Sequence, residues 1–239
     1  MHSNLRIHIA PIGFEVKRVT DPIVSERADK VYLITQLKND KATEHINEIK
    51  NVLKNEKSLE IVTMGTNIWD LYECIKTYKQ IIEKEKNSHI YINVSTGSKI
   101  SCIAGMLACM IWRGTPYYAM INYDYISNGK DKFSKENLTG LIELPVYSIN
   151  KPRKEWLIIL EILRNNKGKI NKHKLIEKLE DSTIINQQLS IAAKHSRLKS
   201  LLTPISIYSD NPLVQVEYKG RQSNIILTQQ GENTLKIFS

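Results

Sequence analysis

Two hydrophobic periods alternate through the first half of the chain. Five short segments rich in Ile, Val and Tyr predict strands, and four segments between them have the apolar spacing of amphipathic helices. The predicted strands are residues 6–11, 30–35, 59–63, 89–94 and 116–121, and the predicted helices are residues 16–26, 43–55, 68–85 and 99–112. This alternation predicts an α/β unit: a Rossmann-like parallel sheet with helices on both faces.

The pattern becomes polar after residue 121. Residues 122–140 contain the turn signal Asn128-Gly129, which indicates a loop or hairpin, and residues 141–149 predict a last strand. The segment 150–153 is polar and contains a proline. We therefore place a domain boundary after residue 150.

The remaining residues follow a different pattern. Residues 154–165 predict an amphipathic helix, Asn171 is suited to cap a helix over 172–179, and a third helix is expected from about 188 to 202, ending before Pro204. Residues 213–218 and 224–227 predict a hairpin with Lys219, Gly220 and Arg221 at its tip, followed by Thr228 as the cap of a short helix. These are the parts of a winged helix-turn-helix, so we expect domains over 1–150 and 151–239.

Positive charge is concentrated in the second predicted domain. The chain carries a formal net charge of +9; residues 1–150 hold 19 basic and 17 acidic side chains, and residues 151–239 hold 15 and 8. A basic module joined to a near-neutral one is typical of a protein that binds a polyanion, above all nucleic acid. The alternative is a lysine-rich surface that only maintains solubility.

Several classes of protein are not indicated. Cys74, Cys102 and Cys109 are odd in number and form no C-x-x-C pair, so we expect no disulfide framework, no zinc site and a reducing cytoplasm. The six histidines lack metal-ligand spacing, and we expect the strand residue His8 to be buried in the sheet. The longest apolar stretch, residues 100–112, is too short to span a membrane, and no export signal is present. The three tryptophans, Trp69, Trp112 and Trp156, are expected in the core; the alternative for Trp69, with Asp70, is that it frames a base by stacking.

Candidate ligand-binding residues follow three of the predicted strands. Ligands of open parallel sheets bind beyond the carboxyl ends of the strands, where helix N-termini direct backbone N–H groups outward. The loops there read Ile12-Gly13-Phe14-Glu15, Met64-Gly65-Thr66-Asn67 and Ser95-Thr96-Gly97-Ser98-Lys99. Glycines, hydroxyls and one lysine suit a phosphate or a nucleotide. Neither a nucleoside triphosphate loop nor a dinucleotide fingerprint is present, and the alternative for 95–99 is a helix cap beside a close-packed glycine.

The chain resembles the CARF-domain winged-helix regulators of archaea. The resemblance rests on I-H-I-A-P-I-G-F-E-V-K-R-V at the start, N-V-S-T-G-S-K after the fourth strand and K-G-R-Q-S-N-I-I-L-T-Q-Q-G-E-N-T-L near the end. It implies a homodimeric, CRISPR-associated sensor that binds a cyclic oligoadenylate or related cyclic nucleotide across the two-fold axis and controls a DNA-binding module. By position, Gly13 and Phe14 would lie in one ligand loop. The second ligand loop would hold Asn93, Ser95, Thr96, Gly97 and Lys99.

The third helix and the hairpin tip supply the candidate DNA-binding residues. A helix in the major groove needs polar or basic ends for base edges, and flanking cations neutralise phosphates. The candidates are Lys194, His195, Ser196, Arg197, Lys199, Lys219 and Arg221. We expect double-stranded DNA as partner and no resident cofactor or metal, the cyclic nucleotide being a regulatory ligand.

Three functions from different classes follow. The first is a ligand-responsive transcription regulator, coupled through residues 147–153. The second is a metal-independent ring nuclease that cleaves cyclic oligoadenylate, for which Lys99 and Ser95 would stabilise charge; no adjacent His or carboxylate offers a general base, so we assign no catalytic residue. The third is a DNA-binding protein with a vestigial sensor.

Overall fold

The computed structural model describes residues 5–38, 43–56, 58–125, 133–206, 209–219 and 222–238. Two compact units make up the chain, Met1–Ile149 and Asn150–Ser239. Each unit has a buried apolar core of its own.

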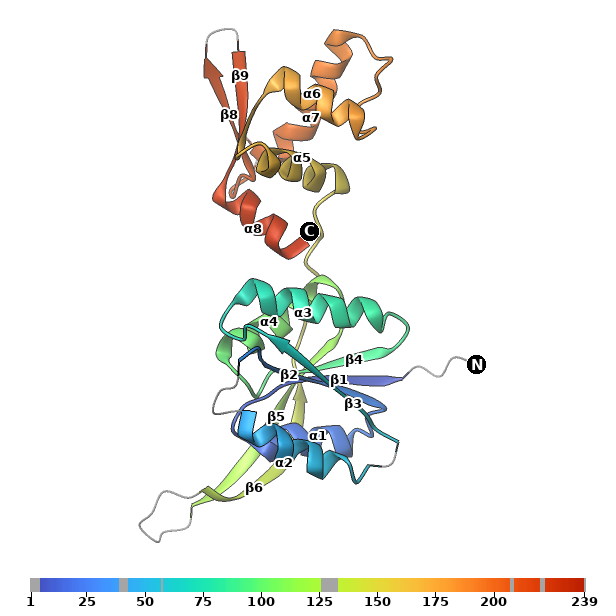
Figure 1. The fold of residues 1–239 in the computed structure, drawn as a ribbon, viewed down its shortest axis with the longest axis vertical. Helices are drawn as coiled ribbons and strands as arrows, with labels where there is room; N and C mark the ends of the chain where they lie inside the picture. The colour runs from blue at the N-terminus through green and yellow to red at the C-terminus, as the bar shows by residue number, and fades with distance from the viewer. Residues whose placement is uncertain are drawn as a thin grey trace. The chain divides into compact units, whose positions relative to one another are not determined.

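A six-stranded sheet forms the middle layer of the first unit (Figure 1), with strand order β3-β2-β1-β4-β5-β6. Its strands are β1 (Arg6–Pro11), β2 (Lys30–Gln36), β3 (Glu60–Thr66), β4 (His89–Asn93), β5 (Thr115–Tyr125) and β6 (Phe133–Glu143). Strands β1 to β5 pair in parallel, and β6 is antiparallel to β5. The order reverses between β1 and β4, which makes their carboxyl ends the topological switch point where ligands bind such sheets.

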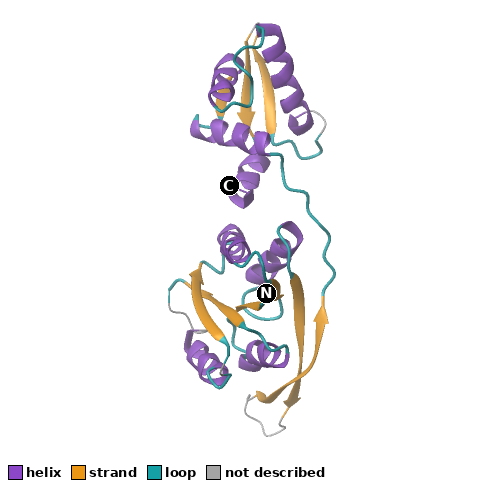
Figure 2. Ribbon diagram, turned by 90° about the vertical axis from the view of Figure 1, so that its right-hand side faces the viewer, coloured by secondary structure: helices purple, strands orange, loops and turns teal. Residues whose placement is uncertain are grey.

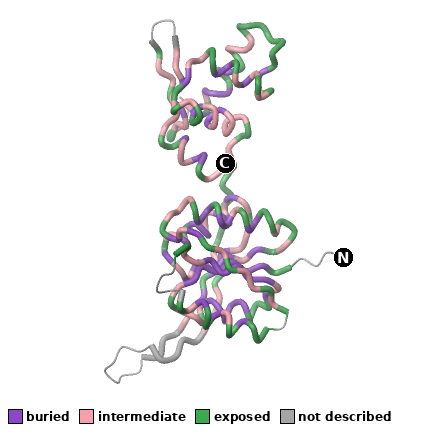
Figure 3. The backbone as a smooth tube through the Cα atoms, in the orientation of Figure 1, coloured by how far each residue is buried: buried purple, intermediate pink, exposed green. Residues whose placement is uncertain are grey.

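Four helices cover the sheet. They are α1 (Val16–Ser25), α2 (Thr43–Leu53), α3 (Leu71–Lys84) and α4 (Lys99–Ile111). Helices α1 and α2 pack on one face and α3 and α4 on the other (Figures 1 and 2). The central strands are therefore buried on both sides, and residues 30–34 of β2 are all buried (Figure 3). The expected mostly parallel α/β sheet is confirmed.

The last strand differs from the sequence expectation. Strand β6 covers residues 133–143, whereas residues 144–150 form no strand. Strand β5 extends to Tyr125 and pairs with β6, so of the expected loop or hairpin over 122–140 the structure contains the antiparallel strands of a hairpin. The antiparallel partner β6 supplies β5 with backbone hydrogen bonds. The polar sequence at the end of β5 does not by itself predict a strand. Pro145 lacks the N–H group that a strand over 141–149 would need.

The second unit combines four helices with a three-stranded sheet of order β7-β9-β8. Its elements are α5 (Lys154–Asn165), β7 (Lys169–Asn171), α6 (Lys172–Asp181), α7 (Ile191–Ser206), β8 (Val214–Lys219), β9 (Gln222–Leu227) and α8 (Gln229–Phe238). Asn171 caps α6 by accepting from the backbone N–H of His173 at 2.9 Å, and Thr228 caps α8 by accepting from that of Gly231 at 3.0 Å. Both expected caps are confirmed; strand β7, only three residues long, escaped prediction.

Helix α7 continues past Pro204 to Ser206, so the expected end before Pro204 is wrong. Proline removes one backbone N–H from a helix. The hydroxyls of Thr203 and Ser206 donate to the carbonyls of Lys199 and Leu202, each at 2.8 Å, and satisfy acceptors in this last part of the helix. Ile205, buried in the core, holds the extra turn in place.

No helix within the described parts of the chain combines the length and apolar character needed to cross a membrane.

Candidate functional site

The loops after β1 and β4 are packed directly against each other at the switch point. A Cβ atom on Gly13 would lie 2.8 Å from the Thr96 hydroxyl and 2.9 Å from the Gly97 nitrogen. Gly97 has a φ of +84°, and a Cβ there would lie 2.5 Å from the Cβ of Pro11. Both glycines are therefore needed for contact between the two loops. For residues 95–99, the alternative of a close-packed glycine is therefore correct at Gly97, whether or not the loops also bind a ligand.

The loop after β3 is tied to the same region by Ser98. The Ser98 hydroxyl accepts from the backbone N–H of Ser101 at 3.0 Å, which caps α4, and donates to the carbonyl of Ile68 at 2.6 Å. Ser98 is buried, and so is Thr96. These two hydroxyls are thus directed into the protein. Gly65 and Thr66 belong to strand β3, where Thr66 is buried and Gly65 faces Leu37.

Asn93 orders the loop that follows β4. Its side-chain oxygen accepts from the backbone N–H of Ser95 at 3.0 Å and from the Ser95 hydroxyl at 2.5 Å, and its amide donates to the carbonyl of Arg18 at 2.8 Å. Asn93 is fully buried. Asn93 thus fixes the position of Ser95, which is only partly buried, and any effect of Asn93 on a bound ligand would pass through Ser95.

Sequence analysis missed Arg18, a second cation at this edge. Its guanidinium donates to the carbonyl of Ser95 at 3.1 Å, forms an ion pair with Glu15 at 3.1 Å and lies 5.6 Å from the ring centre of Tyr118. Its side chain is mostly buried. Its position in the first turn of α1, three residues after Glu15, was the available signal. Arg18 holds the β4–α4 loop against α1.

Lys99 and two aromatic rings, Phe14 and Trp69, are exposed at this edge. Lys99 begins α4 and is exposed, and no ion pair to it is found within the described residues. Phe14 is 64% exposed, with its ring edge-on to His45. Trp69 is 66% exposed, so its expected place in the core is wrong. Trp69 lies in the loop between β3 and α3, one residue before the N-cap Asp70 of α3. Asn67, whose side chain accepts from the backbone N–H of Trp69 at 3.2 Å, is partly exposed beside it.

His8 is buried in the sheet, as expected. Its Nδ1 atom lies 3.2 Å from the Tyr117 hydroxyl, and its ring stacks on Tyr91. Burial, assisted by the charge of Arg6, lowers the pKa of His8 from 6.5 to about 4. A neutral imidazole shielded from solvent is part of the core, not of the exposed edge. Within the described residues, no three His, Cys, Asp or Glu side chains gather in a way that would hold a metal ion.

Helix α7 separates the candidate DNA-binding residues into two groups. Ser196, Arg197 and Lys199 are exposed. Lys194 instead forms an ion pair with Glu180 of α6 at 2.5 Å, with most of both side chains buried. The side chain of Lys194 on α7 is thus directed toward α6 and not toward solvent. Arg221 and the side chain of Lys219 lie outside the described residues.

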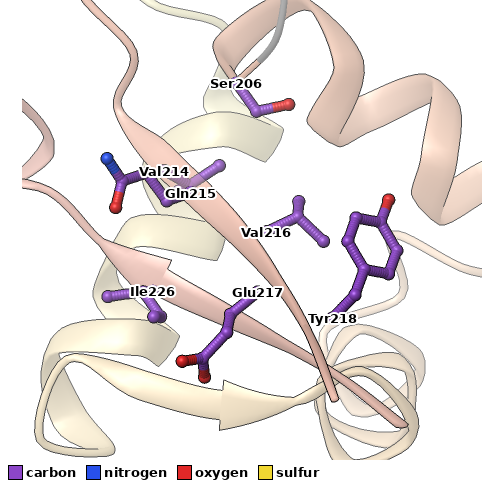
Figure 4. A pocket seen from close by; sticks show the side chains of 7 residues that line it. All are labelled: Ser206, Val214, Gln215, Val216, Glu217, Tyr218 and Ile226. Atoms are coloured by element: carbon purple, nitrogen blue, oxygen red, sulfur yellow. The ribbon is translucent and has the colours of Figure 1, made fainter. Parts of the chain in front are cut away.

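A groove lies between α7 and the hairpin of β8 and β9, which we call the wing. This α7–wing groove has a volume of about 220 Å³, and its polar lining residues are Lys172, Lys199, Thr203, Ser206, Tyr218 and Ser223. A second hollow of about 440 Å³ follows β8 and shares Ser206, Val216 and Tyr218 with the groove (Figure 4). Figure 4 shows Val216 and Tyr218 on the opposite side of β8 from Glu217, as strand alternation requires. Sequence analysis missed Lys172 and Tyr218.

His195 lies beside a second histidine. The rings of His173 on α6 and His195 on α7 meet edge to face, with 5.1 Å between their centres. Partial burial and the charges of Lys172 and His173 lower the pKa of His195. The Nδ1 atom of His195 is buried and has no hydrogen-bond partner among the described residues.

Comparisons with known proteins distinguish the two units. Residues 6–123 match the family model HFX_2341_N-like, N-terminal, and residues 155–239 match the DUF6293 C-terminal winged helix domain. The chain is also 32% identical over 186 residues to the uncharacterized protein MJ1513 of Methanocaldococcus jannaschii, an alignment that covers 66% of this chain and 55% of that protein. The chain thus spans about half the length of this curated relative.

Solved structures with a similar chain path were also found. Csm6 of Enterococcus italicus, bound to cyclic hexa-2'-fluoro-hexa-dAMP, has a TM-score of 0.43 at 13% identity, covering 85% of this chain and 56% of its own. Can2 of Sulfobacillus thermosulfidooxidans, in complex with cyclic tetra-adenylate, has a TM-score of 0.43 at 11% identity, covering 97% and 63%. The strand order of the first unit and the family match of the second together define the architecture: a mostly parallel α/β unit followed by a winged helix domain.

Proposed function

We propose that this chain is a ligand-responsive, DNA-binding transcription regulator that acts as a homodimer. Its first unit binds a cyclic oligoadenylate or a related cyclic nucleotide, and its second unit binds duplex DNA. The observation that carries the proposal is the exposed edge made by Phe14, Trp69 and Lys99 at the carboxyl ends of the parallel strands. The cation suits a phosphate at the start of α4, and the two rings suit nucleobases.

A homodimer fits the surface of the first unit. Helix α4 carries apolar residues away from the sheet as well as toward it: Ile103 is 50% exposed, and Met106, Leu107 and Met110 are partly exposed. Tyr118, Met120 and Ile142 are exposed on β5 and β6, on the face of the sheet that carries α1. The apolar surface of α4 is suited to a second copy of the chain, and a symmetric ring ligand would present the same phosphates to both copies. Ile103→Glu should give a monomer in light scattering, whereas Val52→Glu, on exposed α2, should leave the dimer intact.

The basic winged helix domain supports DNA as the partner. Ser196, Arg197 and Lys199 are exposed on α7, the helix expected in the major groove. The formal charge of residues 151–239 favours a polyanion over an acidic or neutral partner. In a regulator, the ligand must also bind with different affinity to two conformations of the protein, one that can bind DNA and one that cannot.

The ligand proposal is tested by isothermal titration of the full chain with cyclic tri-, tetra- and hexa-adenylate and with cyclic di-AMP. Lys99→Ala should weaken binding of the preferred ring by about tenfold or more, because a charged contact to phosphate contributes about 1.5–3 kcal/mol. Lys76→Ala, an exposed lysine on α3, is the matched control. Equal affinity of wild type and Lys99→Ala would place the ligand elsewhere.

The regulatory step is tested by titrating duplex DNA with and without the preferred ring. A change in DNA affinity supports a regulator; an unchanged affinity supports a vestigial sensor. The ring nuclease alternative predicts a linear product after prolonged incubation, reduced in Lys99→Ala. We propose no catalytic residue, because the Ser95 hydroxyl donates to Asn93 and the nearby carboxylate of Glu15 is paired with Arg18.

A further inference from the structure

The α7–wing groove and the histidine pair beside it form one cluster of basic groups. Lys172 links them, since it lines the groove with Lys199 and its charge also acts on His195. His195 precedes Lys199 by one helical turn on α7, so both side chains leave the same face of that helix. Lys172 and Lys199 line the groove, and His173 and His195 adjoin them on the same two helices.

Among the described residues, no carboxylate forms an ion pair with a member of this cluster. The cations next to the rings are Lys172, which precedes His173 and whose charge acts on His195, and Lys199, one helical turn after His195. Lys194 is paired with Glu180, and Glu177, one turn after His173 on α6, is exposed and forms no ion pair with either histidine. Adjacent positive groups without acidic partners repel one another, and a bound anion would relieve that repulsion.

The remaining lining of the groove suits a sugar-phosphate backbone. Thr203, Tyr218 and Ser223 contribute hydroxyls from α7 and the wing, above an apolar floor that includes Leu202 and Ile225. Hydroxyl and lysine contacts of this kind are the ones that position a protein on duplex DNA without reading its sequence. A volume of about 220 Å³ accommodates a phosphate and part of a sugar, but not a stacked base pair.

We propose that Lys172, His173, His195 and Lys199 form a binding site for a DNA backbone phosphate at the mouth of the α7–wing groove, and that the histidine pair takes up a proton when DNA binds. The proposal rests on the proposed DNA-binding function and adds to it a named phosphate site and a dependence on pH.

The proton uptake follows from the geometry. In the free protein, burial and the neighbouring charges of Lys172 and His173 favour the neutral form of His195. A phosphate at the groove would oppose those charges and favour the imidazolium. Histidine titrates near neutral pH, so DNA affinity should rise as the pH falls from about 8 to 6. Linkage limits the effect to tenfold per pH unit for each proton bound.

The test uses the full chain and a fluorescent duplex of about 25 base pairs in anisotropy titrations at pH 6, 7 and 8. Wild-type affinity should rise several-fold toward pH 6, and His173→Asn/His195→Asn should bind with little dependence on pH. His89→Asn, an exposed histidine of the first unit, should retain the wild-type dependence. Titration calorimetry in two buffers of different ionisation enthalpy should detect proton uptake by wild type and not by the double variant.

The lysines are tested by the salt dependence of the same titration. Lys172→Ala/Lys199→Ala should reduce the slope of log affinity against log salt by about 0.9 for each phosphate no longer neutralised. Lys174→Ala, exposed on α6 near Lys172, is the control for a general loss of charge. If wild type binds the duplex but its pH dependence equals that of the histidine variant, or the salt slope is unchanged, the phosphate site is refuted. If wild type binds no duplex at any pH, the proposed DNA-binding function itself fails.

Discussion

Replacing Gly97 by alanine should destabilise the first unit more than the same change at any glycine that lacks its two constraints. At φ +84° an L side chain costs about 1–3 kcal/mol, and forcing a methyl group into packed surroundings costs about 1–3 kcal/mol more. The added Cβ would lie 2.5 Å from Pro11 and 2.9 Å from the Ser101 hydroxyl, both held by buried backbone. We expect a total loss of about 2–6 kcal/mol for Gly97→Ala.

Three other glycines separate these contributions. Gly168 has a φ of +77° and nothing within 4 Å of its added Cβ, so Gly168→Ala isolates the backbone cost of about 1–3 kcal/mol. Gly13→Ala isolates the steric cost, because its Cβ would meet Thr96 and Gly97. Gly140→Ala has neither constraint and should be close to neutral.

Differential scanning calorimetry measures these changes and assigns each to a unit by the transition that shifts. Gly97, Gly13 and Gly140 belong to the first unit and Gly168 to the second. If Gly97→Ala is no more destabilising than Gly168→Ala, or if Gly13→Ala behaves like Gly140→Ala, the two loops are not in the tight contact described above.

Three further predictions concern charged and titratable groups. The pKa of His8 is about 4 in the folded chain and 6.5 in the unfolded chain, so its contribution to the free energy of unfolding is complete above pH 6.5 and is lost as the pH falls toward 4. Between pH 7 and 4.5, urea denaturation should show that wild type loses about 2–3 kcal/mol more stability than His8→Gln. Equal losses would contradict this assignment. Burial would raise the pKa of Glu85, but the Tyr32 hydroxyl at 2.5 Å and Lys30 at 3.0 Å lower it overall. Glu85→Gln should therefore lower the free energy of unfolding at pH 7, and this loss should become smaller as the pH falls below 4.5. Lys199→Ala should weaken binding to DNA about fivefold at 0.15 M salt, whereas Lys194→Ala should have little effect on DNA and mainly reduce stability, because Glu180 already neutralises Lys194; an equal effect on anisotropy titrations would refute this distinction.

The sequence alone predicted most elements because their periods are strong. Strand β1 and helix α5 have the predicted bounds, and the caps Asn171 and Thr228 were recognisable from their chemistry. Strand β6 was misplaced because a polar strand is specified by its partner β5 and not by its own pattern. The extension of α7 beyond Pro204 depends on burial of Ile205, a tertiary contact that local propensity does not encode.

The assignment of ligand-binding and DNA-binding residues stays a prediction, and the structure describes where their side chains lie. The loops after β1 and β4 lie at the expected edge of the sheet, whereas Gly65 and Thr66 belong to strand β3. The burial of Thr96 and Ser98 depends on contacts with residues 13 and 68 from other loops. The contributions of Arg18 and Lys172 depend on neighbours distant in sequence, Ser95 and the wing. Likewise, the partner that removes Lys194 from the exposed surface of α7 lies on a different helix.

Some residues of the three edge loops are packed and others are exposed, which has a practical consequence for protein engineering. Gly13, Gly97 and Ser98 hold the loops to one another, so a library that randomises them would consist mainly of misfolded members. Phe14, Asn67, Trp69 and Lys99 make few internal contacts and reach solvent. A search for altered ligand preference should therefore vary these four positions and keep the first three fixed.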